Sequence, residues 1–83
     1  MKAEEIKGAI LEEIAAIAPD AELAGLDPEA DLREALDLDS MDILNLVIAL
    51  SKRLGVAIPD RDAGRLVTLQ GGVDYLLEAD ATG

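Results

Sequence analysis

The chain has 83 residues, 18 of them acidic and 7 basic, which gives a formal net charge of -11 at pH 7. Its length predicts one domain over residues 1–83, and its charge argues against nucleic acid and anionic membrane surfaces as partners. Because the chain has neither cysteine nor histidine, it can form no Ser-His-Asp or Cys-His catalytic site. If the protein handles a reactive group, we expect that group to be borrowed.

The first predicted element is an amphipathic helix over residues 3–17. At about 100° per residue its isoleucines fall in one narrow stripe, which contains Ile6, Ile10, Ile14 and Ile17. Pro19 ends this helix. From Pro19 to Asp39 the apolar pattern is interrupted, which predicts a long connection that is pinned by scattered leucines and holds one short helical turn near residues 30–35.

The second predicted helix, residues 40–54, has more apolar surface than a core requires. One stripe, which must pack on the other helices, contains Ile43, Leu46, Val47, Leu50 and Leu54. A second stripe on nearly the opposite side contains Met41, Leu44 and Ile48. This second stripe is either covered by the long connection or exposed for a partner protein, and the sequence leaves both possibilities open. Gly55 is expected to end the helix.

The rest of the chain predicts a link and a final helix. Residues 56–64 read as an extended link followed by a turn that is briefly helical. Thr68 is a good N-cap for the final helix, whose apolar face contains Leu69, Val73, Leu76 and Leu77. Gly71 and Gly72 are expected to weaken its first turn, and residues 79–83 are expected to be loose. The predicted fold class is all-α, with three main helices, one short helix and an aliphatic core.

Ser40 stands at the start of the second helix, within the run Asp37-Leu38-Asp39-Ser40-Met41-Asp42. One interpretation makes it the N-cap of the helix, with the neighbouring acids favoured by the helix dipole. The other makes it an exposed, fixed hydroxyl, where an attached phosphate would be stabilised by the helix N-terminus. In that case Asp39 and Asp42 would face a basic partner. The acids do not match the calcium-loop pattern, so no metal site is predicted.

Three segments together resemble the acyl carrier protein family. They are the run Leu38-Asp39-Ser40-Met41-Asp42 before an apolar helix, the link Ile58-Pro59-Asp60, and the stretch Thr68-Leu69-Gln70-Gly71-Gly72-Val73-Asp74-Tyr75-Leu76. The likeness covers nearly the whole chain. It implies a four-helix bundle with a long loop between its first two helices.

The resemblance also implies a function without catalysis. Ser40 would be the attachment point of 4′-phosphopantetheine, installed from coenzyme A by a separate phosphopantetheinyl transferase, with Asp39 as the flanking acid. The arm's thiol would hold acyl groups as thioesters, which accounts for the absence of cysteine. Met41, Leu44 and Ile48, together with Asp42 and Asn45, would meet the transferase and the enzymes that load and transfer acyl groups.

One departure from the family pattern concerns the charge of the second helix. Many carriers of fatty acid synthesis are strongly acidic there, whereas Asn45, Ser51, Lys52 and Arg53 occupy that face here. This difference predicts a specialised carrier in fatty acid or related lipid synthesis. A carrier of a polyketide or nonribosomal peptide pathway and an unmodified acidic helical adaptor are the alternatives. No apolar run approaches the roughly 20 residues of a spanning helix, and self-repulsion favours a monomer, so a cytoplasmic monomer is expected.

Overall fold

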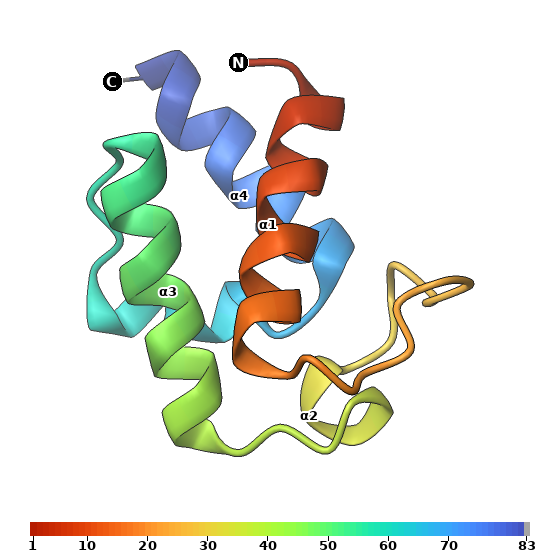
Figure 1. Cartoon of the computed structure of the whole chain (residues 1–83). Coiled ribbons are helices and arrows are strands. Elements are labelled where there is room, and N and C mark those ends of the chain that lie inside the picture. Colours follow the sequence, from red (N-terminus) through yellow and green to blue (C-terminus); the bar gives the residue numbers. More distant parts are fainter. Residues whose placement is uncertain (83) are drawn as a thin grey trace.

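The computed structural model describes residues 1–82, and in this part of the chain it contains helices and loops but no strand. The elements are α1 (Ala3–Ile17), α2 (Leu32–Ala35), α3 (Ser40–Leu54), the 3₁₀ helix η1 (Asp60–Leu66) and α4 (Leu69–Thr82) (Figure 1). The all-α prediction is therefore confirmed, as are the bounds of the first two main helices and the short helix in the long connection. The predicted turn after the link is η1, which runs two residues further than expected.

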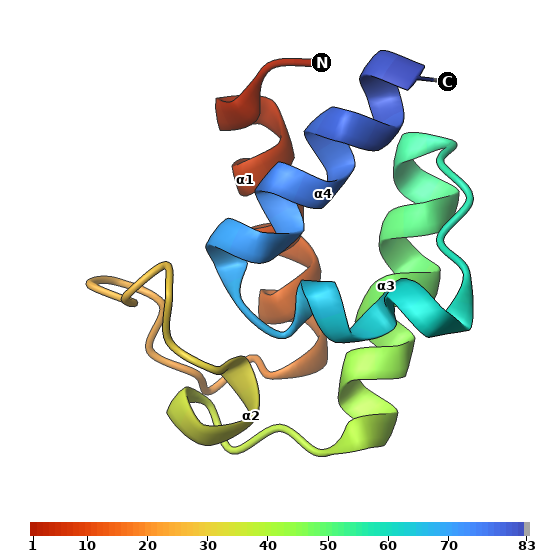
Figure 2. The same ribbon diagram turned by 180° about the vertical axis from the view of Figure 1, so that it is seen from behind.

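The helices form a bundle in which α1 contacts both α3 and α4. Figures 1 and 2 show α1 and α3 running in opposite directions, with η1 lying across the bundle between α3 and α4. α2 and the first turn of α3 lie at one end of the bundle, and the start of α1 and the end of α4 lie at the other. None of the described helices is both long enough and apolar enough to cross a membrane.

The core is aliphatic apart from Tyr75, as the composition predicts. The side chains that are almost completely buried are Ile6, Ile14, Leu32, Leu46, Leu50, Leu66, Leu69 and Leu76. They come from every helix, so the predicted inward stripes of α1 and α3 meet in one cluster. Burying each side chain of this size contributes roughly 1.5–3 kcal/mol.

The long connection between α1 and α3 is held against the bundle by backbone hydrogen bonds. The Leu32 N–H donates to the Val67 carbonyl at 2.7 Å, and the Gln70 N–H donates to the Pro28 carbonyl at 2.8 Å. Leucines of the connection also pack on the core, with Leu32 fully buried. These contacts confirm a loop pinned by its leucines, and they fix α2 next to the junction of η1 and α4.

The two glycines at the start of α4 lie close to neighbouring atoms that leave little room for a side chain. A Cβ on Gly71 would lie 2.6 Å from the Arg65 carbonyl oxygen and 2.7 Å from Thr68 Oγ1, and one on Gly72 would lie 3.1 Å from Ile10 Cδ1. Thr68 caps the helix as predicted, because its Oγ1 accepts a 2.9 Å hydrogen bond from the Gly71 N–H. The expectation that Gly71 merely weakens this turn is wrong, since a larger residue would not fit.

The expectation of a loose segment over residues 79–83 is also wrong where the structure describes it. α4 continues to Thr82, and Gly83 lies outside the described residues. One contact near the end of the helix joins the two ends of the chain, because the Met1 amino group donates to Asp80 Oδ2 at 2.7 Å. This long-range partner could not be read from the local pattern.

Candidate functional site

The start of α3 is closed by a capping box made of two carboxylates. The Asp42 N–H donates to Asp39 Oδ1 at 2.9 Å, and the Asp39 N–H donates to Asp42 Oδ2 at 3.2 Å. Asp39 is therefore the N-cap, and the interpretation of Ser40 as the cap is wrong. Both acids satisfy donors at the helix end that would otherwise lack partners. Within the described residues, no group of three or more possible ligands could hold a metal ion.

The segment before Ser40 gives the serine a fixed position. Asp37 has a φ of 56°, the left-handed conformation that aspartate tolerates better than most residues. The chain then passes through Leu38, which is buried, before Asp39 caps the helix. Ser40 is the first residue of α3 and is exposed, and the buried Ile43 follows in the first turn. Burial on both sides thus anchors an exposed serine.

Among the side chains that the structure describes, Ser40 has a hydroxyl that makes no hydrogen bond. Ser51 Oγ donates to the Val56 carbonyl at 2.7 Å, Thr68 Oγ1 caps α4, and Tyr75 Oη donates to Asp62 at 2.7 Å. The Ser40 hydroxyl makes no such bond to any described residue, and the residue is exposed. It can therefore accept a substituent without breaking a contact that holds the fold together.

A cavity of about 270 Å³ opens beside Ser40. It is lined by Arg33, Ser40, Ile43, Leu44, Asp60, Ala63, Gly64 and Val67. These residues come from two stretches of the chain, 33–44 (α2 and the start of α3) and 60–67 (η1 and the residue after it), which meet to build one space. The lining is mainly apolar, and its charged members are one cation, Arg33, and one anion, Asp60.

The second apolar stripe of α3 is exposed, which decides between the two possibilities left open by the sequence. Met41 is 60% exposed, Leu44 is 37% exposed and Ile48 is 44% exposed. Their spacings of three and four residues place them along one face of the helix. Leu44 also lines the cavity beside Ser40, so the stripe and the cavity share an edge at the start of α3.

The polar residues of α3 do not all lie on this exposed face. Asn45 and Lys52 are exposed beside the stripe, as expected. Ser51 instead bonds the Val56 carbonyl. Arg53 contacts α1 through hydrogen bonds of 2.9 and 3.0 Å to two glutamates, Glu12 and Glu13. The expectation that Ser51 and Arg53 belong to the partner face is therefore wrong, because both hold the end of α3 to its neighbours.

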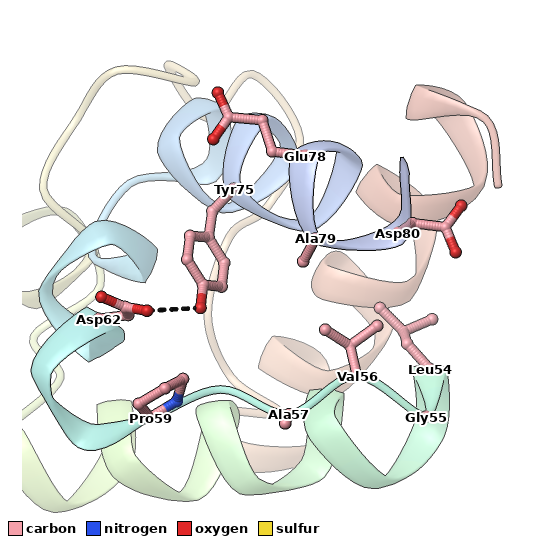
Figure 3. Close-up of a pocket in the computed structure, with 10 residues that line it drawn as sticks. All are labelled: Leu54, Gly55, Val56, Ala57, Pro59, Asp62, Tyr75, Glu78, Ala79 and Asp80. Carbon is pink, nitrogen blue, oxygen red and sulfur yellow. Dashed lines mark hydrogen bonds between the residues drawn. The ribbon is translucent and has the colours of Figure 1, made fainter. Parts of the chain in front are cut away.

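Tyr75 holds η1, one wall of the cavity, against α4. Its hydroxyl donates to Asp62 on η1, and the Arg65 guanidinium lies 5.0 Å from the centre of its ring. The hydrogen bond to Asp62, with desolvation, raises the pKa of Tyr75. Figure 3 shows this bond at the edge of a second cavity of about 640 Å³, whose other side is the link before η1, including Pro59. Neither Ser40 nor the stripe lines this larger cavity.

The sequence did not indicate the residues that complete the cavity beside Ser40. The sequence predicts a short helical turn around Arg33 and a link that reaches Asp60, and it indicates no role for Val67. No spacing or motif connects these three positions. They meet because the Leu32 N–H bonds the Val67 carbonyl, which places α2 against the end of η1.

Comparison with known proteins gives a consistent result. A family model described as a phosphopantetheine attachment site matches residues 8–76. The acyl carrier protein of Campylobacter hominis is 33% identical over 73 residues, which cover 88% of this chain and 86% of that protein. The chain belongs to the acyl carrier protein family. The acyl carrier protein of Thermosynechococcus vestitus is 39% identical over 70 residues, covering 81% of this chain and 86% of that one.

Two further relatives extend this likeness. The acyl carrier protein of Rubrobacter xylanophilus is 41% identical over 51 residues, a match that spans 61% of this carrier and 63%, less than two thirds, of that protein. The solution structure of a candidate acyl carrier protein from Anaplasma phagocytophilum superposes with a TM-score of 0.79 at 27% identity, covering 100% of this chain and 94% of that one. The bundle seen here is therefore the fold of the family.

Membership of this family makes the chain a carrier and not a catalyst, with 4′-phosphopantetheine as its covalent cofactor. The family works with a phosphopantetheinyl transferase and with synthesis enzymes. The residues present fit such a group, since an exposed hydroxyl without a partner stands at the edge of a mainly apolar cavity. When bound, the group supplies the thiol that this chain, with no cysteine, lacks.

Proposed function

We propose that Ser40 carries the 4′-phosphopantetheine arm and that this protein holds acyl groups as thioesters on the arm's thiol. The observation that supports this most directly is the free hydroxyl of Ser40. The other described hydroxyls are engaged in hydrogen bonds that join secondary structure elements or cap one of them. A phosphate on Ser40 would also lie at the amino end of a 15-residue helix, where the helix dipole favours negative charge.

The cavity beside Ser40 favours apolar cargo. Its lining includes Ile43, Leu44 and Val67, and each CH₂ group of an acyl chain that leaves water gains about 0.8 kcal/mol. The cavity opens next to the attachment point, since Ser40 is one of its lining residues. We propose that part of the cargo is sheltered there.

The exposed stripe is the proposed docking site for enzymes. Met41, Leu44 and Ile48 offer an apolar row that starts next to Ser40, and Asp42 and Asn45 flank it. A transferase, or an enzyme that loads or transfers acyl groups, must approach Ser40, and it would then cover this row. The charge of -11 favours a monomer that meets basic partners.

We further propose a specialised role in fatty acid or related lipid synthesis, in the cytoplasm where coenzyme A is available to the transferase. The support is the exposed face of α3, where Asn45 and Lys52 stand in place of the acidic residues with which many carriers of fatty acid synthesis bind basic partners. Replacing both with glutamate (Asn45→Glu, Lys52→Glu) is expected to raise the rates of general fatty acid synthesis enzymes with this carrier. Unchanged rates would count against specialisation, and good rates with enzymes of polyketide or nonribosomal peptide assembly would indicate that pathway instead.

Intact mass measures the attachment itself. The protein is incubated with coenzyme A, magnesium and a broad-specificity phosphopantetheinyl transferase, next to the variants Ser40→Ala and Ser51→Ala. The expected result is a gain of one phosphopantetheinyl group in the wild type and in Ser51→Ala, and none in Ser40→Ala. No gain in a folded wild type would refute the proposal and favour an unmodified helical adaptor that binds through the stripe.

A further inference from the structure

Arg33 is the cation in the lining of the cavity beside Ser40. It extends from α2, the short helix whose place is fixed by the buried Leu32 and by the Leu32 N–H bond to Val67. The other basic residues of the chain, which lie outside this lining, are Lys2, Lys7, Lys52, Arg53, Arg61 and Arg65. In a protein of net charge -11, a cation at this particular position needs an explanation.

The guanidinium of Arg33 is oriented by Asp31 and still has donors to offer. Its Nε donates to Asp31 Oδ1 at 3.0 Å and one terminal nitrogen donates to Asp31 Oδ2 at 2.7 Å. A guanidinium has five N–H donors, so three remain. Asp31 itself is fixed, because it is the N-cap of α2 and accepts a bond from the Arg33 N–H. The Asp31 carboxylate thus orients the Arg33 guanidinium, and the N–H groups on its other edge are open to a ligand.

The charges around Ser40 are otherwise negative. Asp39 and Asp42 form the capping box of α3, and Asp60 lines the same cavity as Ser40. A phosphodiester on the Ser40 oxygen would add another negative charge at this point. Arginine forms strong charge-assisted hydrogen bonds with phosphate, and Arg33 is the lining residue able to make them.

We propose that Arg33 is a positioning residue that binds the phosphodiester of the arm through the open edge of its guanidinium and holds the arm at the mouth of the cavity. This inference rests on the proposed attachment of the arm to Ser40. Binding at Arg33 gives the phosphate a cationic partner among the surrounding carboxylates. The arm then starts over the apolar cavity, and its thiol spends less time extended into solvent.

Nuclear magnetic resonance of the holo protein tests this directly. Conversion of the apo to the holo form, confirmed by intact mass, is expected to shift the Nη–H signals of Arg33, whose open edge they form, and to leave those of Arg53 and Arg61 in place. The ³¹P signal of the arm in Arg33→Gln is expected to move to its position in urea-unfolded holo protein, and Arg33→Lys is expected to restore part of the shift. An Arg33 signal that does not move on conversion, or a ³¹P signal that is the same in Arg33→Gln, would overturn the proposal.

Two control variants separate binding from a structural role. Asp31→Asn breaks the ion pair but keeps both the cation and a residue able to cap α2, so it is expected to retain the ³¹P shift. If Arg33 mattered only through its pair with Asp31, this variant and Arg33→Gln would behave alike. Lys52→Gln also removes one positive charge, but at a position roughly 18 Å along α3 from Ser40. This variant is expected to leave the ³¹P signal unchanged.

The thiol of the arm gives an independent measurement, because the chain has no cysteine of its own. With neutral 4,4′-dithiodipyridine, the thiol of holo Arg33→Gln is expected to react about twofold to fivefold faster than that of the wild type, the range for one exposed ion pair. Equal rates would refute the holding of the arm at the cavity. Absence of a mass gain would instead show that the attachment itself had failed, so the two failures are distinguishable.

Discussion

Replacing Ile48 by alanine removes three carbon atoms from the exposed stripe of α3. If fully buried, these carbons would be worth about 0.8 kcal/mol each, but the side chain is only 44% exposed and the rest is already covered. A partner that covers the exposed part therefore gains about 1 kcal/mol from it. We expect kcat/KM of the phosphopantetheinyl transferase with Ile48→Ala to be about fivefold lower than with the wild type. Intact mass recorded over time measures this rate.

The same chemical change in the core provides the control. Ile14 on α1 is 0% exposed, so Ile14→Ala is expected to lower the free energy of unfolding by about 2–5 kcal/mol. Ile48→Ala should stay within about 0.5 kcal/mol of the wild type. Urea unfolding followed by circular dichroism measures both. The reasoning is refuted if Ile48→Ala loses as much stability as Ile14→Ala, or if the folded variant is charged at the wild-type rate.

Three further substitutions test the elements that frame the site. Gly71→Ala is expected to lower the free energy of unfolding by about 1–2 kcal/mol despite alanine's higher helix propensity, because the new Cβ would lie 2.6 Å from the Arg65 carbonyl oxygen. Gly8→Ala, where the new Cβ meets open space, should raise the free energy of unfolding by up to about 1 kcal/mol. Equal effects of the two substitutions in urea unfolding would contradict this reasoning. Asp39→Ala should cost about 1 kcal/mol, and Asp39→Asn, which still caps, about half as much; equal losses would argue against capping. Tyr75→Phe should cost about 1 kcal/mol at pH 7. Because the bond to Asp62 raises the pKa of Tyr75 above 10.0, this difference should be full below pH 10 and vanish as the pH rises through the raised pKa; a difference independent of pH between 7 and 11 would refute the role of the bond.

The sequence predicts the main helices well because strong periodicity and clear ends agree. The isoleucine stripe of α1 stops before Pro19, and α3 stops at Gly55, whose φ of 67° suits glycine. The exposure of the second stripe was not decided by the pattern, since a helix with two apolar faces can be covered on both. The burial of each face depends on where the long connection runs, and that is fixed by bonds such as Gln70 to Pro28.

The details of the candidate site required the structure. Asp39 and Ser40 are both good N-caps, and the extended backbone of Asp39 (φ -99°, ψ -179°) decides between them. Ser51 and Arg53 lie at the borders of the exposed face of α3, where tertiary neighbours determine their contacts. Arg33 joins the cavity only through the placement of α2. Local patterns thus indicate the serine, but not the residues that surround it.

The end-to-end geometry of the bundle has a practical consequence for studying the carrier. The Met1 amino group donates a hydrogen bond to Asp80, and the start of α1 and the end of α4 lie at the end of the bundle opposite the first turn of α3 (Figures 1 and 2). A protein immobilised through its amino terminus would therefore turn Ser40 and the stripe away from the support. Enzymes flowing over such a surface would meet the face of interest in a uniform orientation, so rates of docking and release could be compared between variants without steric interference from the tether.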